Sequence, residues 1–300
     1  MGERGTNKPK PNAVVFGLPA AVYHSDPCEV PSLSSSVANI LVSRSPLHAW
    51  HAHPRLGGRP YEPSASMDAG SVAHAVLLGT AQEELVVVDA EDWRTKAAQE
   101  ARAAAREQGK CAVLPATLAE ITASVDVIRK RFARYGVRFT GRSEVSLFWT
   151  EQASDGTIIQ CRGRIDHLIL KDGRARILDL KTARSAHPRA CQSHAYEYGY
   201  DIQAAAYRSA FAKLYPRYSG REEFLWLFAE LDGPNAVAPY ALDGSFDWLG
   251  ERRWRRAVDL WARCLREDSW PSYTDEILRL EAPQYAVALE EEEGYGSSQI

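Results

Sequence analysis

The sequence lacks the features of a membrane or exported protein, and it lacks a strong overall charge. No run approaches the roughly 18–20 apolar residues that span a bilayer, and the opening MGERGTNKPKPNAVV contains no apolar signal core. The formal net charge is −3 over 300 residues, so no global field draws the chain to nucleic acid or to a membrane. We therefore expect a soluble intracellular protein that binds any anionic partner through a local patch.

The sequence also lacks paired cysteines. No two cysteines lie within four residues of each other, which excludes the spacing of a zinc knuckle or of an iron–sulfur cluster. An odd, scattered set is typical of reduced thiols in a cytoplasm. The sequence therefore predicts no iron–sulfur cluster. The five are Cys28, Cys111, Cys161, Cys191 and Cys264.

Polar composition marks both ends of the chain. Residues 1–14 are polar and contain Pro and Gly, and we expect a disordered arm there. Residues 287–300 contain four consecutive glutamates before a Gly/Ser-rich end, and we expect an acidic flexible tail. No repeat or linker divides residues 15–286, so one domain is expected between the two ends.

Apolar periodicity predicts helices before and after a β-rich middle. Serines 34–36 can cap a helix that carries Val37 and Leu41 and ends at Ser45-Pro46. Further helices are expected over residues 67–79, from 115 to about 132, from about 195 to 214, and around WLGERRWRRAVDLWARCLRE.

The middle of the chain has the composition of a sheet. The runs SEVSLFWT, TIIQCRGRIDHLILK and RARILDLKT are separated by SDG and DG, which are strong turn signals. They predict a three-stranded antiparallel meander, and EFLWLFAEL predicts a further strand. Helices on either side of a central mixed or antiparallel sheet make an α/β or α+β fold.

An aspartate and a lysine interrupt the apolar run RILDLKTAR. Because side chains alternate along a strand, Asp179 and Lys181 share one face while Leu178 and Leu180 point to the other. If the KDGR turn pairs this strand with the preceding one, Asp166 comes close to Asp179. Asp166, Asp179 and Lys181 would then lie close together in strands whose apolar residues otherwise predict a buried core.

Two adjacent carboxylates repel each other unless a cation lies between them. Oxygen ligands of this kind suit Mg²⁺ or Mn²⁺, which also bind substrate phosphates. A neighbouring lysine can orient a water or stabilise negative charge on a phosphate. The set describes metal-dependent phosphodiester hydrolysis. A buried Asp–Lys salt bridge, with Asp166 capping a turn, fits the same spacing, and the spacing alone leaves both interpretations open.

Five motifs follow one another in a fixed order along the chain. They are Gly70-x-x-x-His74, Glu144 in SEVSLFW, Gly163-Arg164-Ile165-Asp166, Asp179-Leu180-Lys181-Thr182 and Gln203-x-x-x-Tyr207. Over about residues 20 to 285, this series resembles that of the PD-(D/E)xK nuclease superfamily. More closely, the sequence is similar to exonuclease VIII and the RecE-like phage recombination exonucleases. The resemblance implies a restriction-endonuclease-like core.

The resemblance implies a magnesium site, with manganese as a possible substitute. His74, Asp166 and Asp179 would be the metal ligands, completed by the carbonyl of Leu180. The motif at Asp179 is Asp-x-Lys rather than Glu-x-Lys, but both carboxylates ligate hard metals.

The same resemblance assigns the catalytic groups. Lys181 would position the attacking water, and Glu144 matches the acidic position of the family's first strand. Gln203 and Tyr207 lie four residues apart and so on one helical face. They match a pair that supports the site and contacts the scissile DNA strand.

Candidate DNA contacts outside the motifs are basic. Arg94 and Lys96 lie near a helix start, where phosphate binds favourably, and Arg44 lies where the family's N-terminal helix approaches the DNA end. The arginines of ERRWRRA fit phosphate contacts, but we favour a solvated helix face whose core side carries Trp254 and Trp261.

The resemblance implies a Mg²⁺-dependent exonuclease that degrades one strand of linear duplex DNA from a 5′ end and leaves a 3′ overhang. It further implies a homo-oligomeric ring, with a tetramer favoured, and a RecT-like single-strand annealing partner. The location would be a bacterial cytoplasm, from a phage or prophage gene. A Cas4-like or other repair nuclease of different polarity, or a silent DNA-binding homologue, stays an alternative.

Overall fold

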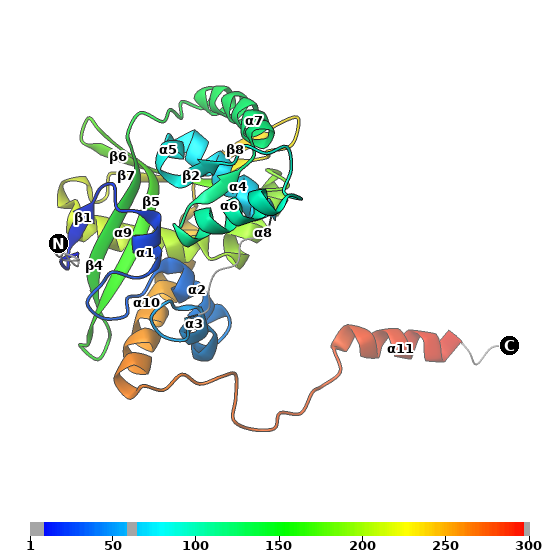
Figure 1. The fold of residues 1–300 in the computed structure, drawn as a ribbon. Helices are drawn as coiled ribbons and strands as arrows, with labels where there is room; N and C mark the ends of the chain where they lie inside the picture. The colour runs from blue at the N-terminus through cyan, green and yellow to red at the C-terminus, as the bar shows by residue number, and fades with distance from the viewer. Residues whose placement is uncertain (1–8, 59–64, 297–300) are drawn as a thin grey trace.

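The computed structural model describes residues 9–58 and 65–296. Its centre is a six-stranded sheet in the order β1-β4-β5-β6-β7-β8 (Figure 1). Strands β6 and β7 pair in parallel, and the other neighbours are antiparallel, so the sheet is mixed. The strands are β1 (Ala13–Val15), β4 (Arg142–Gln152), β5 (Ile158–Lys171), β6 (Arg174–Thr182), β7 (Glu222–Ala229) and β8 (Val237–Tyr240).

The predicted three-stranded meander is confirmed by β4, β5 and β6. The turn between β5 and β6 is an Asp-Gly turn in which Asp172 and Gly173 have φ of 49° and 72°. Positive φ at both central residues suits the twist of a two-residue hairpin. This turn fixes the register Lys171↔Arg174, and the register determines which residues of β5 and β6 lie opposite each other.

Helices cover both faces of the sheet and enclose two apolar clusters (Figure 1). On one face, α2, α9 and α10 pack their apolar sides on the sheet. On the other, α4 and α7 pack against residues such as Leu178 and Leu180 of β6. The helices in chain order are α1 (Ala20–His24), α2 (Ser35–Ser43), α3 (Pro46–Ala52), α4 (Ala65–Leu78), α5 (Ala81–Glu84), α6 (Lys96–Glu107), α7 (Pro115–Ala133), α8 (Pro188–Glu197), α9 (Tyr200–Leu214), α10 (Gly244–Glu267) and α11 (Gln284–Gly296).

Two short strands and a 3₁₀ turn complete the described secondary structure. Strands β2 (Leu85–Val87) and β3 (Cys111–Val113) form a separate parallel pair, and a 3₁₀ turn spans Pro216–Tyr218. Among the helices of residues 9–58 and 65–296, none is both long and apolar enough to cross a membrane.

Two helix predictions need correction. The helix expected from about 195 to 214 is two helices, because Gly199 adopts a φ of 70° between α8 and α9. The Ser45-Pro46 boundary ends α2 as predicted, but Pro46 also starts α3, where a missing N–H costs nothing.

The arginine stretch of α10 also differs from the expected solvated face. Trp254 and Trp261 are buried as predicted, but Arg253 is only 8% exposed. Its guanidinium donates to both carboxylate oxygens of Asp201 on α9, at 2.9 Å each, and to Asn39 on α2 at 3.0 Å. The arginine therefore joins three helices and is not available to a phosphate.

Both predicted ends contain regular structure. Strand β1 begins at Ala13, inside the expected arm 1–14, and residues 1–8 of that arm lie outside the described residues. Helix α11 begins at Gln284 and overlaps the expected flexible tail 287–300, of which residues 297–300 lie outside the described residues. The assignment of residues 15–286 to one nuclease domain stays a prediction.

Candidate active site

The candidate site lies where β5 and β6 separate. Their antiparallel ladder ends at the pair His167↔Leu178, and the next residues on the two strands are Asp166 and Asp179. Beyond this point β6 pairs with β7, and β5 pairs with β4 and, through a single bridge at Cys161, with Leu33. We call this point of separation, at Asp166 and Asp179, the fork. The backbone N–H of Leu180 donates there to Oδ2 of Asp166 at 2.8 Å, so a side chain satisfies the N–H that no longer pairs with β5.

Helix α4 brings His74 to the fork. Nε2 of His74 lies 3.0 Å from Oδ2 of Asp166, and Nδ1 lies 3.5 Å from Oε1 of Glu144. The close approach of α4 requires Gly70, since a Cβ there would lie 2.9 Å from Oγ1 of Thr182. One ligand atom from each of His74, Glu144 and Asp166 lies within 4.8 Å of the others, which is a spacing that suits one metal ion.

Glu144 is held in an unfavourable backbone conformation. Its φ of 55° lies in the left-handed region within strand β4, where a non-glycine residue is uncommon. The flanking pairs Ser143↔His167 and Val145↔Ile165 place it opposite Asp166. The Nε of Arg164 donates to Glu144 and fixes its carboxylate toward the fork. Such local strain persists where surrounding contacts enforce it, and it concentrates at functional sites.

Asp179 and Lys181 face the opposite side of the sheet, toward α9. Nζ of Lys181 lies 2.5 Å from Oδ2 of Asp179 and 4.3 Å from the centre of the Tyr200 ring. Nε2 of Gln203 donates to Oδ1 of Asp179 at 2.6 Å. Nε1 of Trp226 donates to Oε1 of Gln203 at 3.5 Å, and this contact orients the Gln203 amide. The two sides of the site meet through Leu180, between Asp179 and Lys181.

Tyr207 of α9 supports the site by binding the backbone of β5. It is 4% exposed, and its hydroxyl donates to the Arg164 carbonyl at 2.7 Å and accepts from the Arg164 N–H at 3.1 Å. Its ring lies against Gly163, where a Cβ would be 2.6 Å from Cε1. The tyrosine therefore positions the Arg164 backbone, and little of its surface is left for direct contact with DNA.

Burial and mutual repulsion make two of the acids weak. Burial and the neighbouring Asp166 charge raise the pKa of Glu144 to about 7. Burial raises the pKa of Asp179 to about 6, although Lys181 opposes the rise. Both carboxyl groups thus hold protons at a pH where exposed acids are ionised.

The other two groups have the opposite electrostatic balance. Burial would lower the pKa of His74, but the Asp166 carboxylate and the hydrogen bond to it raise that pKa to about 9. The pKa of Asp166 is lowered despite its burial, because His74 attracts its charge. The protonated imidazole thus occupies the place of a cation among three carboxylates.

The donor set fits a hard divalent cation. Carboxylates with one imidazole and no thiolate suit Mg²⁺ or Mn²⁺, and the cluster already favours positive charge. His74, Glu144 and Asp166 form the compact set, whereas Asp179 points to Lys181 and Gln203. The predicted role of the Leu180 carbonyl as a metal ligand stays a prediction. The observed contact of this residue is the hydrogen bond from its backbone N–H to Asp166.

The predicted DNA-binding residues outside the motifs lie apart from the cluster. Arg94 and Lys96 are highly exposed and pair with Asp92 at 3.5 Å and Glu100 at 3.6 Å. Arg44 is exposed at the end of α2. None of the three contacts the fork among the described residues, so their role in DNA binding stays a prediction.

Sequence patterns missed three residues that complete the geometry. Arg164 holds Glu144, Tyr200 lies against the Lys181 ammonium, and Trp226 orients Gln203. Arg164 belongs to the motif Gly163–Asp166 and shares the strand face of Asp166, so strand periodicity could have found it. Tyr200 and Trp226 reach the site through the packing of α9 on the sheet, which no spacing reveals.

A mixed sheet with Asp166 and Asp-x-Lys at the fork of two strands, and helices on both faces, defines the fold of the PD-(D/E)xK superfamily. The chain belongs to the family described as a PDDEXK-like domain of unknown function (DUF3799), whose model matches residues 41–282. The predicted superfamily and fold class are thereby confirmed.

A solved structure shares the fold at low sequence identity. A protein from Eubacterium rectale described as a candidate exonuclease has a TM-score of 0.58 and 13% identity, covering 95% of this chain and 100% of that chain. The protein SSO0001 matches with a TM-score of 0.29 and 15% identity, covering 65% and 86%, which is too low to support an argument. No curated protein gives a significant match.

Proposed function

We propose that this protein is a Mg²⁺-dependent exodeoxyribonuclease that degrades one strand of linear duplex DNA from its 5′ end. The observation that carries the proposal is the fork itself, where His74, Glu144 and Asp166 join the Asp179–Lys181 pair through the Leu180 N–H. The structural neighbour described as an exonuclease supports the exonuclease class, and the RecE-like motif order supports the 5′ polarity.

The residues of the fork would hold one divalent cation. His74, Glu144 and Asp166 offer the compact ligand set, with Asp179 completing it on ionisation. When bound, the cation supplies positive charge that stabilises the phosphorane-like transition state and the leaving oxygen. Manganese is a substitute with the same ligand preference.

Lys181 is the residue best placed to act on the nucleophile. Burial would lower the pKa of its ammonium, but the adjacent Asp179 carboxylate outweighs burial and raises that pKa above the usual lysine value. An ammonium that stays protonated orients a water and stabilises charge on a phosphate oxygen, but it does not accept the water's proton. Gln203 fixes the Asp179 carboxylate through a hydrogen bond, and the Tyr200 ring lies against the Lys181 ammonium.

The biological setting follows the RecE-like resemblance. The 3′ overhang left by digestion is the substrate of a RecT-like annealing protein, and a homo-oligomeric ring, a tetramer in our proposal, would keep the enzyme on DNA. In a ring, arginines from several copies face one channel, which compensates for the small net charge. The cellular location in this proposal is a bacterial cytoplasm, from a phage or prophage gene.

End-labelled linear duplexes test the activity and its polarity. With Mg²⁺ the protein should release a 5′ label as short products and leave the complementary strand intact, and EDTA should stop release. Lys181→Ala should slow digestion by about 10²–10⁴-fold, since it removes a group that acts in the transition state. Lys171→Ala, at the exposed end of β5, is the matched control and should digest at the wild-type rate.

Two outcomes contradict the proposal. Release of a 3′ label first would assign the other polarity, and digestion of Lys181→Ala at the wild-type rate would remove the lysine from the site. The resistance of 5′-blocked duplexes then separates an exonuclease from an endonuclease.

A further inference from the structure

The chain leaves its folded body after Tyr273 and continues as an exposed arm. Up to that point it is fixed, because Trp270 packs on Trp261 with ring centres 5.2 Å apart and Tyr273 lies 5.4 Å from the His48 ring. Residues 274–285 are all exposed. Figure 1 shows this segment and α11 standing apart from the sheet and its helices.

The arm carries three large apolar side chains that are mostly or fully exposed. Ile277 is 100% exposed and Leu280 is 98% exposed, and Leu278 is exposed too. Single exposed apolar residues are ordinary, but three within four positions form a contiguous apolar segment of the kind that marks an interaction site. The segment TDEILRLEA also contains three acidic residues and one arginine. A surface that binds it must therefore accept an acidic peptide with aliphatic side chains.

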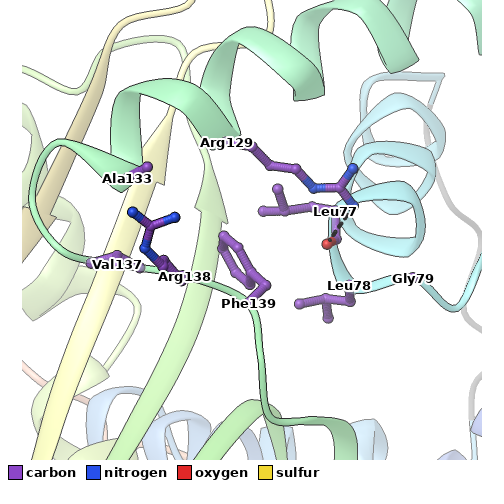
Figure 2. Close-up of a pocket in the computed structure, with 8 residues that line it drawn as sticks. All are labelled: Leu77, Leu78, Gly79, Arg129, Ala133, Val137, Arg138 and Phe139. Atoms are coloured by element: carbon purple, nitrogen blue, oxygen red, sulfur yellow. Dashed lines mark hydrogen bonds between the residues drawn. The ribbon is translucent and has the colours of Figure 1, made fainter.

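A cavity on the body has the complementary chemistry. Its volume is about 330 Å³, and its walls come from the end of α4, the end of α7 and the segment 137–139. Figure 2 shows the Phe139 ring facing Leu77 and Leu78, with Arg129 and Arg138 on either side. Arg129 is held by the carbonyls of Val76 and Leu77 at 2.6 and 2.9 Å.

Arg138 gives the cavity an available positive charge. Arg138 is exposed, and no ion pair of it is seen in the described part of the chain, whereas Arg129 pairs with Asp126 at 3.7 Å. An aliphatic side chain in the cavity would place flanking carboxylates next to Arg138, and Asp275, Glu276 and Glu281 flank the arm's aliphatic residues on both sides. Complementary charge around an apolar contact favours a specific orientation of the peptide.

The arm cannot reach the cavity of its own chain. From Thr274 to Leu280 an extended chain spans at most about 25 Å, whereas a folded body of this length measures roughly 45–50 Å across. Figure 1 places α7 at the opposite end of the body from the end of α10, after which the chain continues toward the arm. A cavity on another molecule is free of this limit.

We propose that the arm segment 274–282 docks into the Phe139 cavity of a second copy of this chain, with Ile277 or Leu280 against Leu77, Leu78 and Phe139 and the arm's acids against Arg138. The contact joins two different surfaces, so it closes as a reciprocal exchange between two copies or as a ring, and otherwise extends as an open chain of copies. It does not depend on nuclease activity.

Sedimentation velocity of the full chain, without DNA or metal, tests the contact. Wild type should self-associate at micromolar concentration, and Ile277→Ser/Leu280→Ser should raise the dissociation constant at least tenfold. Arg138→Glu should weaken association from the cavity side. Ile158→Ser is the matched control, since Ile158 is 60% exposed outside the arm, and it should associate like wild type.

Cross-linking identifies the two surfaces. A tagged chain with Ile277→Cys, mixed with an untagged chain with Arg138→Cys, should form a disulfide between the chains under mild oxidation, and the parent chain should not. A wild-type chain that stays monomeric up to about 100 μM, association unchanged by the arm and cavity variants, or the absence of the disulfide between the two chains would each overturn the proposal.

Discussion

At the residue scale, the charge of Asp166 raises the pKa values of its neighbours at the fork. Glu144 and Asp179 hold protons more tightly than exposed acids do, and His74 is held protonated by Asp166. In each case the folded chain binds a proton that the unfolded chain would release in the same pH range. The metal-free protein is therefore under electrostatic strain that deprotonation increases.

This balance predicts that the metal-free protein loses stability as the pH rises. The folded-state pKa is about 6 for Asp179, about 7 for Glu144 and about 9 for His74, each above its ordinary value. These three groups bind more protons in the native state than in the unfolded state. His167 and His24, whose pKa values burial lowers, oppose this effect only up to about pH 6.5, so the free energy of unfolding should fall between about pH 6.5 and 9. Urea unfolding in EDTA across this range measures the slope.

Substitution assigns part of that slope to one residue. Glu144→Gln cannot ionise, so its stability should fall less steeply than that of wild type between about pH 5 and 7. Glu251→Gln, at an exposed position of α10, should keep the wild-type slope. A wild-type stability that rises with pH over the whole range would contradict the assignment.

The sequence predicted the fork's principal residues better than it predicted their contacts. Asp166, Asp179 and Lys181 follow from strand alternation and the Asp-Gly turn, because both have fixed geometry. Alternation alone left a plain salt bridge open, and the structure contains that ion pair as well as the cluster around His74. The left-handed conformation of Glu144 could not be predicted, since no turn residue marks it.

At the element scale, the site depends on how closely α4 and α9 approach the sheet. Glycines permit both contacts, with Gly70 facing Thr182 and Gly163 facing Tyr207. The predicted helix periods gave the buried faces of α7 and α10 correctly. Periodicity could not show that Arg253 turns inward, because its partners on α9 and α2 are distant in sequence.

Gly163→Ala tests the approach of α9. The new Cβ would lie 2.6 Å from the Tyr207 ring, and the ring cannot move aside because its hydroxyl is bonded twice to Arg164 and its face packs on Phe224. Overpacking of this kind costs about 1–3 kcal/mol. The free energy of unfolding, measured in urea, should fall by that amount, and DNA digestion should slow because Arg164 positions Glu144.

The control substitution is Gly244→Ala at the start of α10. A Cβ there meets nothing within 4 Å, so its stability should stay within about 0.5 kcal/mol of wild type. Equal stability of Gly163→Ala and Gly244→Ala would show that α9 shifts freely and does not fix the site.

At the scale of the whole molecule, the site connects the two layers of helices through the sheet. His74 comes from α4 on one face, and Gln203 and Tyr200 reach Asp179 and Lys181 from α9 on the other. A cation at the fork would therefore hold both layers to the sheet. The family match over residues 41–282 includes both helices.

Divalent cations should raise the melting temperature of the protein without DNA. A ligand that binds only the folded state at 100 times its dissociation constant adds about 2.7 kcal/mol, and roughly 2–4 °C per kcal/mol gives a rise of about 5–10 °C. Saturating Mg²⁺ or Mn²⁺ at pH 8 should produce this shift, and EDTA should reverse it. Calorimetry or dye-based melting measures it independently of activity.

Two variants separate binding of the cation from catalysis. Asp166→Asn should abolish the metal-induced shift, because Asp166 lies at the centre of the ligand cluster. Lys181→Ala should keep the shift while losing digestion, since the lysine orients water and holds no metal. If Lys181→Ala lost the shift and Asp166→Asn kept it, the cation would bind on the α9 side of the sheet, and the assignment of His74, Glu144 and Asp166 as the ligand set would be wrong.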